Sequence, residues 1–336
     1  MSCSRAATPE VDTLPYSLED KLVIGISSRA LFALETEHLI YTEKGEDAYV
    51  AYMRKHEDVP LKPGTGFALV KALLAINDAL KERVIEVVIV SHNNVDSGLR
   101  IMKSARAAGL DITRGSFAGG EHAYEYLDDW HCKLFLSASR GNVQKVLAAG
   151  HAAALVFDLP EKFVPIENQV RIAFDGDAVI FDSTAAQIYE QQDLPTFLSH
   201  EAEHANEPLG AGPLKGFLEA VADIQKRFST AKGTCPIRTA VVTARNAPAE
   251  ERAIKTLRAW DIRVDEIHFL GGVSKAGILT RFRPHIYFDD QRDQLITDIP
   301  CAEVCRTELE LPEKMPMRTE KDYRIAAPNW KSTIGG

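Results

Sequence analysis

Short, continuously apolar segments alternate with longer amphipathic ones along most of this 336-residue chain. A strand that is apolar at every position is buried on both faces, as parallel strands are when helices cover both sides of their sheet. The alternation therefore predicts an α/β fold built on parallel sheets. The predicted strands span residues 21–27, 84–91, 133–138, 153–158, 170–175, 238–244, 266–272 and 285–290, and the predicted helices span 66–82, 97–109, 141–150, 213–228 and 249–260.

The chain also contains an internal repeat. Ser27 of "GISSRALF" aligns with Asp175 of "AFDGDAVIF", and a proline follows 33 residues later in both halves. After one shift of four residues, Ser91 aligns with Thr243, and each is followed 28 residues later by a glycine pair. Since these landmarks stay in register, we infer a duplication and predict two α/β halves that share one topology.

Length and repeat together predict two domains, because 336 residues exceed what one hydrophobic core usually holds. The expected organisation is an arm at 1–17, a first domain at 18–160, a second at 166–305 with a cap inserted at about 183–237, and a tail at 306–336. The tail has little apolar periodicity, so it is expected to wrap the surface or a neighbouring subunit, which leaves a homo-oligomer open.

The net charge of −9 argues against a nucleic-acid or anionic-membrane partner, because both need a basic surface. We find no apolar run of 18 residues that could span a membrane, and the N-terminus does not read as a signal peptide. The five cysteines are scattered and suit reduced thiols. These features predict a cytoplasmic protein.

Two aspartates one residue apart follow the apolar segment that ends at Phe174. Ionised carboxylates are costly inside a core, so Asp175 and Asp177 are expected where a buried strand emerges at its C-terminal end, the edge at which open α/β sheets bind ligands. Thr243, Lys275 and "FDD" at 288–290 follow or flank other predicted strand ends. The first half lacks these groups: the positions of Asp175, Asp177, Lys275, Asp289 and Asp290 are occupied there by Ser27, Arg29, Ala123, Ser137 and Ala138.

Four carboxylates on one edge repel one another unless some are protonated or a cation joins them. Mg²⁺ prefers carboxylates, water and a substrate phosphate as ligands. A lysine and a threonine hydroxyl beside that cation suit an anionic substrate. The combination predicts phosphoryl transfer, with a nucleophile, an acid, a metal ion and groups that stabilise charge.

The order of these motifs over residues 170–290 resembles the haloacid dehalogenase superfamily. Over about residues 20–300 the chain resembles the cytosolic 5′-nucleotidase type I family more closely, through "SSRALF", "IYTEKG", "FDGDAV", "GPLKGFLEA", "CPIRT", "VTAR", "IKTLR" and "RPHIYFDDQ". This resemblance includes the first half, which lacks the catalytic aspartates. It implies two haloacid-dehalogenase-like halves, the first degenerate, and Mg²⁺-dependent hydrolysis of a nucleoside 5′-monophosphate such as AMP to nucleoside and phosphate.

The resemblance also implies roles for individual residues. Asp175 is similar to the nucleophile that forms an aspartyl-phosphate, and Asp177 to the acid that protonates the leaving oxygen and then activates water. Thr243 and Lys275 resemble the groups that hold the phosphate. The metal ligands implied are Asp175, Asp289, Asp290 and the backbone carbonyl of Asp177.

Other residues are candidates for substrate binding. Gly176 allows close approach of the backbone, and the residues after Thr243 are expected to line the phosphate pocket: Ala244, Arg245 and Asn246. Within the expected cap, Phe197, His200, His204 and Asn206 are candidates for contacting the base or ribose, and a polar helix surface is the alternative.

Several readings stay open from the sequence. The first half either is structural, which we favour, or binds a regulatory nucleotide through Arg29, His92, Asn93 and Asn94. The alternatives to a nucleotidase are a phosphatase for another small monoester, such as a sugar phosphate, and a non-catalytic nucleotide sensor. A dinucleotide oxidoreductase is disfavoured, because no G-x-G-x-x-G follows "LVIGIS".

Overall fold

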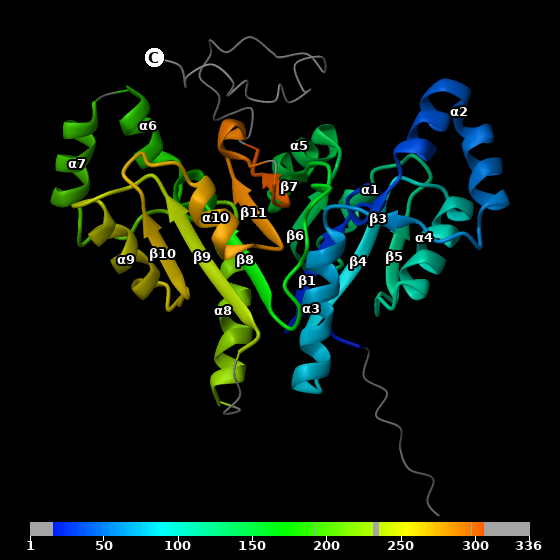
Figure 1. Ribbon diagram of the computed structural model, residues 1–336, viewed down its shortest axis with the longest axis horizontal. Helices are drawn as coiled ribbons and strands as arrows, with labels where there is room; N and C mark the ends of the chain where they lie inside the picture. Colours follow the sequence, from blue (N-terminus) through cyan, green and yellow to red (C-terminus); the bar gives the residue numbers. More distant parts are fainter. Residues whose placement is uncertain (1–15, 192, 231–234, 297, 306–336) are drawn as a thin grey trace, which may run out of the picture. The chain divides into compact units, whose positions relative to one another are not determined.

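The computed structural model describes residues 16–191, 193–230, 235–296 and 298–305 (Figure 1). The expected C-terminal tail and nearly all of the expected N-terminal arm lie outside these residues. The domain boundaries proposed from the sequence stay predictions.

The first half contributes five parallel strands to a sheet, in the order β5-β4-β1-β6-β7. A short hairpin of β2 and β3 lies apart from this sheet. The elements of this half are β1 (Leu22–Ile26), α1 (Ser28–Leu31), β2 (Phe32–Ala33), α2 (Glu35–Lys55), β3 (Lys62–Pro63), α3 (Phe67–Leu80), β4 (Ile85–Ser91), α4 (Val95–Ala107), β5 (Arg114–Phe117), η1 (Ala123–Tyr126), β6 (Cys132–Ser137), α5 (Arg140–Ala148) and β7 (Ala153–Val156).

The second half contributes five further strands in the order β10-β9-β8-β11-β12, which are again parallel to one another. Its elements are β8 (Val170–Phe174), η2 (Gly176–Ile180), α6 (Thr184–Gln191), α7 (Leu194–Glu203), α8 (Lys215–Thr230), β9 (Ile237–Thr243), α9 (Glu250–Ala259), β10 (Glu266–Phe269), α10 (Ala276–Phe282), β11 (Ile286–Asp289), η3 (Arg292–Gln294) and β12 (Cys301–Glu303).

Both halves have the same strand order when each is numbered from its own first sheet strand, namely 3-2-1-4-5. β7 and β12 pair antiparallel and join the two sets into one ten-stranded sheet. The predicted α/β class with a mostly parallel sheet is therefore confirmed. The repeated order is also what a duplication of one unit would leave.

Helices of the two halves share one hydrophobic core. α3 of the first half contacts β8 of the second, and α8 of the second contacts β1 and β6 of the first. β1, β4 and β8 are almost wholly buried, which explains their continuous apolar sequences. Burial at several positions is complete, as at Ile24, Leu73 and Phe217, which belong to one cluster that spans both halves.

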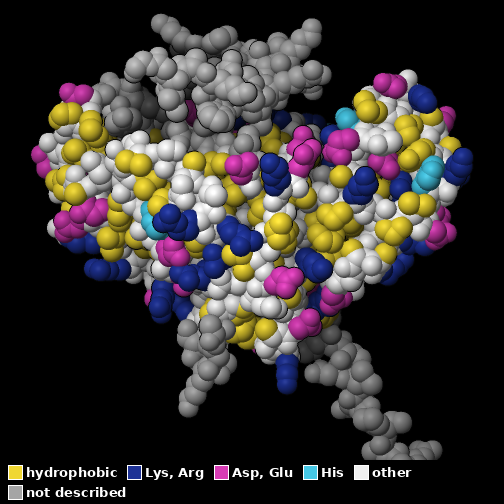
Figure 2. Space-filling view, viewed as in Figure 1, with side chains coloured by type: hydrophobic (Ala, Val, Ile, Leu, Met, Phe, Trp, Pro, Cys, Tyr) yellow, Lys and Arg dark blue, Asp and Glu magenta, His cyan; other side chains and the backbone are white. Residues whose placement is uncertain are grey.

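Other helices lie at the two ends of the sheet. α2 packs against α4 beside β5, and α7 packs against α6 and α9 beside β10 (Figure 1). On the described surface of the face in Figure 2, acidic and basic side chains are interspersed. Among the described residues, we find no helix with the length and apolar character needed to cross a bilayer.

Candidate active site

The predicted catalytic residues meet at the C-terminal ends of three adjacent strands. β8 lies between β9 and β11 and pairs in parallel with both. Asp175 follows β8, Thr243 is the last residue of β9, and Asp289 is the last residue of β11. Lys275 stands immediately before α10. All four are at least 90% buried, so they are largely shielded from water.

Lys275 bridges two aspartates. Its Nζ donates to Asp175 Oδ1 at 2.8 Å and to Asp289 Oδ2 at 2.7 Å. The carboxylate of Asp289 also accepts from the Tyr287 hydroxyl and, at 2.8 Å, from the backbone N–H of Gln291. Asp289 is thereby fixed from three sides, whereas Asp175 has the lysine as its one side-chain hydrogen-bond partner among the described residues.

One lysine does not balance two buried carboxylates. Burial, and then the charge of Asp289, raise the pKa of Asp175 to about 8 despite the opposing effect of Lys275. Burial alone would lower the pKa of Lys275, but the two aspartates raise it, so the lysine stays charged. The charged form of Asp175 is therefore disfavoured without a further cation, and a bound metal ion would stabilise it.

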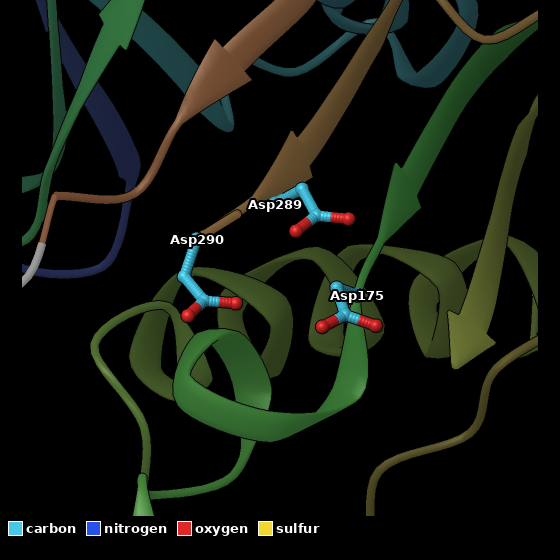
Figure 3. A group of neighbouring side chains, drawn as sticks. All are labelled: Asp175, Asp289 and Asp290. Atoms are coloured by element: carbon cyan, nitrogen blue, oxygen red, sulfur yellow. The ribbon is translucent and has the colours of Figure 1, made fainter. Parts of the chain in front are cut away.

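A third carboxylate joins this group. One oxygen atom from each of Asp175, Asp289 and Asp290 lies within 4.8 Å of the other two. Figure 3 shows these three side chains as neighbours at the strand ends. These ligand atoms are the hard oxygen donors that suit a divalent ion such as Mg²⁺. The residues present therefore fit a metal ion, and the side chain of Asp177 is outside this group.

A tight turn follows Asp175, the predicted nucleophile. η2 reverses the chain after β8, with Asp177 extended and Ala178 at a φ of 60°. Gly176 lies against Thr243: a Cβ atom at Gly176 would stand 3.1 Å from Thr243 Oγ1. Thr243 Oγ1 also accepts from the backbone N–H of Arg245 at 3.2 Å, so its hydroxyl has a fixed place beside the turn.

Arg245 holds the carboxylate of Asp177. Its Nε and Nη2 donate to the two carboxylate oxygens of Asp177 at 2.9 and 2.7 Å. The guanidinium lies 5.8 Å from the Phe181 ring centroid and 5.7 Å from that of Phe197. Arg245 was expected in the phosphate pocket, and the contact with Asp177 was not foreseen.

The sequence of this chain is similar to that of known proteins. The model of a family described as 5′-nucleotidase matches residues 14–307. This chain belongs to the 5′-nucleotidase family. It is 36% identical over 298 residues to a human protein named cytosolic 5′-nucleotidase 1B, covering 86% of this chain and 48% of that protein. The chain thus spans about half the length of this relative. No solved structure matches it significantly.

Family membership confirms the resemblance stated from the sequence. In this 5′-nucleotidase-family chain, the predicted residues of the expected cap lie on or at the end of α7. Phe197 is buried beside Arg245, His200 stacks on His204 with ring centroids 4.2 Å apart, and His204 Nδ1 contacts the carbonyl of His200 at 2.8 Å.

The remaining substrate-binding candidates lie in other surroundings. Ala244 is exposed, Asn246 lies against Gly271, and Asn206 accepts a hydrogen bond from Lys255.

Two residues of this neighbourhood were not identified from the sequence. Tyr287 donates to Asp289, and its position one residue before "FDD" on a buried strand was the available signal. Glu201 is completely buried on α7 and pairs with both Arg245 and Arg252. A buried glutamate is rarely visible in sequence, because glutamates on amphipathic helices usually face solvent.

Several polar side chains at the corresponding edge of the first half are hydrogen-bonded to one another or to the backbone. The Ser28 and Ser91 hydroxyls lie 3.1 Å apart, Asn93 donates to Ser28 at 3.1 Å, and the Tyr49 hydroxyl donates to Asn93 at 3.2 Å. Asn94 caps α4 by accepting from the Ser97 N–H at 2.9 Å. These contacts favour the structural reading of the first half over a nucleotide site that uses both asparagines.

Proposed function

We propose that this protein is a Mg²⁺-dependent 5′-nucleotidase that hydrolyses nucleoside 5′-monophosphates through a phosphorylated aspartate. The observation that carries the proposal is the position of Asp175. It lies at 2.8 Å from Lys275, within the acidic group of Asp289 and Asp290, in a chain of the 5′-nucleotidase family. A nucleophile, a cation and a metal-compatible group thus converge on one strand end.

In the first step, an oxygen of Asp175 attacks the phosphorus atom and the bond to the nucleoside 5′-oxygen breaks. Asp177 gives its proton to that leaving oxygen, which departs as the nucleoside hydroxyl. Lys275 and the Thr243 hydroxyl stabilise the charge that develops on the phosphoryl oxygens. The products of this step are the free nucleoside and an aspartyl-phosphate on Asp175.

In the second step, Asp177 accepts a proton from a water molecule whose oxygen attacks the phosphorus atom. The bond between phosphorus and the Asp175 oxygen breaks, and inorganic phosphate leaves. The same carboxyl therefore acts first as acid and then as base, which restores the starting protonation of the site. Hydrolysis of phosphate monoesters is so slow without a catalyst that such a site lowers the barrier by about 20 kcal/mol or more.

Asp175, Asp289, Asp290 and the Asp177 backbone carbonyl would hold the metal ion. When bound, Mg²⁺ would neutralise the carboxylates and the substrate phosphate so that the two anions can meet. Lys275 balances only part of this charge in the structure described above.

The leaving group is the part of the substrate that the cap is expected to recognise. Phe197, His200 and His204 are proposed to contact the base or ribose, in keeping with their places on or next to α7. The human relative carries the word cytosolic in its name, and we propose the cytoplasm as the location of this protein too.

The test is phosphate release from a panel of nucleoside 5′-monophosphates and sugar phosphates, with Mg²⁺ and with EDTA. We expect turnover of at least one nucleotide with Mg²⁺ and its loss with EDTA. Asp175→Asn should abolish turnover while the protein still folds. Turnover of sugar phosphates alone, or of no nucleotide at all, would refute the nucleotidase proposal, and an active Asp175→Asn variant would refute the nucleophile.

A further inference from the structure

Glu201 is a buried carboxylate that reaches the active site from the α6–α7 helix pair. It is 0% exposed and lies between two arginines: Arg245, which follows β9, and Arg252, which is on α9. Its Oε1 accepts from Arg252 Nη1 at 2.7 Å, and its Oε2 accepts from Arg245 Nη1. His200 Nδ1 also lies 3.2 Å from Oε1. Burying a charge is costly, and these contacts offset that cost.

The arginine between the two acids joins them. Arg245 is 3% exposed, and its fork holds Asp177 while Nη1 of the same guanidinium holds Glu201. Nη1 also lies 3.3 Å from the carbonyl of Ala249. A planar guanidinium that is hydrogen-bonded to carboxylates on two of its edges cannot rotate without losing charge-assisted hydrogen bonds.

We propose that Glu201 is a positioning residue for the reaction: by holding Arg245 from the helix side, it fixes the orientation of the Asp177 carboxyl that transfers the proton. The inference rests on the proposed role of Asp177. A bidentate arginine uses one lone pair on each carboxyl oxygen, so the other lone pairs remain for the proton that Asp177 transfers.

The internal repeat supplies independent support. Arg29, Tyr49 and Met53 each precede their counterparts Asp177, Phe197 and Glu201 by 148 residues. Asn93 and Arg100 precede Arg245 and Arg252 by 152 residues, the offset that also relates Ser91 to Thr243. The first half therefore lacks all three members of the chain from Glu201 through Arg245 to Asp177.

The arginine on the outer side is kept in both halves. Arg100 on α4 reaches α2, where it donates to Glu37 at 2.9 Å and lies 3.4 Å from Met53 Sδ, just as Arg252 on α9 reaches Glu201 on α7. The half without catalytic aspartates has thus retained an ion pair between its helices but has replaced the arginine and glutamate that lead to the strand end. This contrast assigns Arg252 to stability and Arg245 to function.

The experiment compares three variants with the wild type: Glu201→Gln, Arg252→Gln and Glu203→Gln. Glu203 is the control, because it lies on the same helix and is exposed. We measure kcat and KM with the best nucleotide of the panel, together with the melting temperature. Glu201→Gln should lower kcat by about a hundredfold, the lower end of what proton transfer contributes, and change KM by less than about threefold.

Arg252→Gln should lower the melting temperature as Glu201→Gln does but keep kcat within about twofold, and Glu203→Gln should change neither. Should Glu201→Gln not fold, Arg245→Lys keeps the buried charge without the fork and should show the same loss of kcat. The inference is overturned if the folded variant, Glu201→Gln or Arg245→Lys, keeps wild-type kcat. It is also overturned if the loss lies in KM, or if Arg252→Gln loses kcat equally. A wild type without nucleotide turnover would instead refute the proposed function itself.

Discussion

Gly176 and Thr243 are packed so closely that even a methyl group at Gly176 would press on the Thr243 side chain. A Cβ atom at Gly176 would stand 3.1 Å from the Thr243 hydroxyl oxygen and 3.2 Å from its Cβ. The last residue of β9 and the turn after β8 therefore touch through backbone and hydroxyl. The contact places the hydroxyl beside the proposed nucleophile, which precedes the glycine.

Gly176→Ala should displace the Thr243 side chain by a few tenths of an ångström and lower kcat by about tenfold, because catalysis depends on such positions. Steady-state kinetics with a nucleotide substrate measure the effect. Gly277→Ala is the matched control, since nothing within 4 Å meets its new Cβ on α10, and it should keep full activity. Equal activity of the two variants would contradict the role assigned to this contact.

Lys275→Gln should destabilise the metal-free protein by about 3–5 kcal/mol, because it leaves Asp175 and Asp289 buried without their shared cation. Mg²⁺ should restore part of this stability by neutralising the same carboxylates. Urea unfolding in EDTA and in Mg²⁺ measures both effects. Lys255→Gln, on a more exposed lysine paired with Glu251, should change stability by less than about 1 kcal/mol. A Lys275→Gln variant as stable in EDTA as the wild type would count against the charge argument.

Asp290→Asn should raise the Mg²⁺ concentration that gives half-maximal activity by about tenfold or more, while kcat at saturating Mg²⁺ changes less. The reason is that Asp290 belongs to the acidic group, whereas the lysine bridge joins Asp175 and Asp289, so the loss of Asp290 weakens metal binding and leaves that bridge in place. A Mg²⁺ titration of activity measures this. Asp293→Asn, at a nearby exposed aspartate, should leave the titration unchanged.

His285 should make stability depend on pH in mildly acidic solution. Burial lowers its pKa from the usual 6.5 to about 4, and its Nδ1 accepts from the Arg171 N–H at 3.1 Å. The unfolded chain takes up the proton first, so this contribution is complete above about pH 6.5 and is lost as the pH falls towards 4, by up to about 3 kcal/mol.

Urea unfolding between pH 4 and pH 7 tests this dependence in the wild type and in His285→Asn, which keeps an acceptor but does not titrate. The variant should lose less stability than the wild type between pH 6.5 and pH 4.5. The same loss in both proteins would show that other groups carry the pH dependence.

Much of the fold could be predicted because burial on both faces imposes a visible pattern. All eight predicted strands occur, as do helices at the five predicted places. β5 and β12 were missed, since "RGSF" and "CAE" have too few apolar residues to stand out. α2 was missed for a similar reason, because only three of its side chains are buried.

The candidate site was predictable where residues follow strand ends, as Asp175, Thr243 and Asp289 do. What the sequence could not provide is the pairing between elements. The contact of Arg245 with Asp177 and the burial of Glu201 depend on how α7 docks against α9, which no local pattern records. The position of Arg245 two residues after Thr243 suggested a contact with the substrate, and the structure adds its hydrogen bonds to Asp177.

The antiparallel pairing of β7 with β12 gives a reason why the first half has been retained although it lacks the predicted catalytic residues. Without the other half, each half would have an unpaired strand edge. The first half would also expose the apolar side of α3 and the second that of α8, and both kinds of surface favour aggregation. Selection for one active site would therefore preserve both halves of the chain. We expect the first half to protect the second from aggregation throughout the life of the protein.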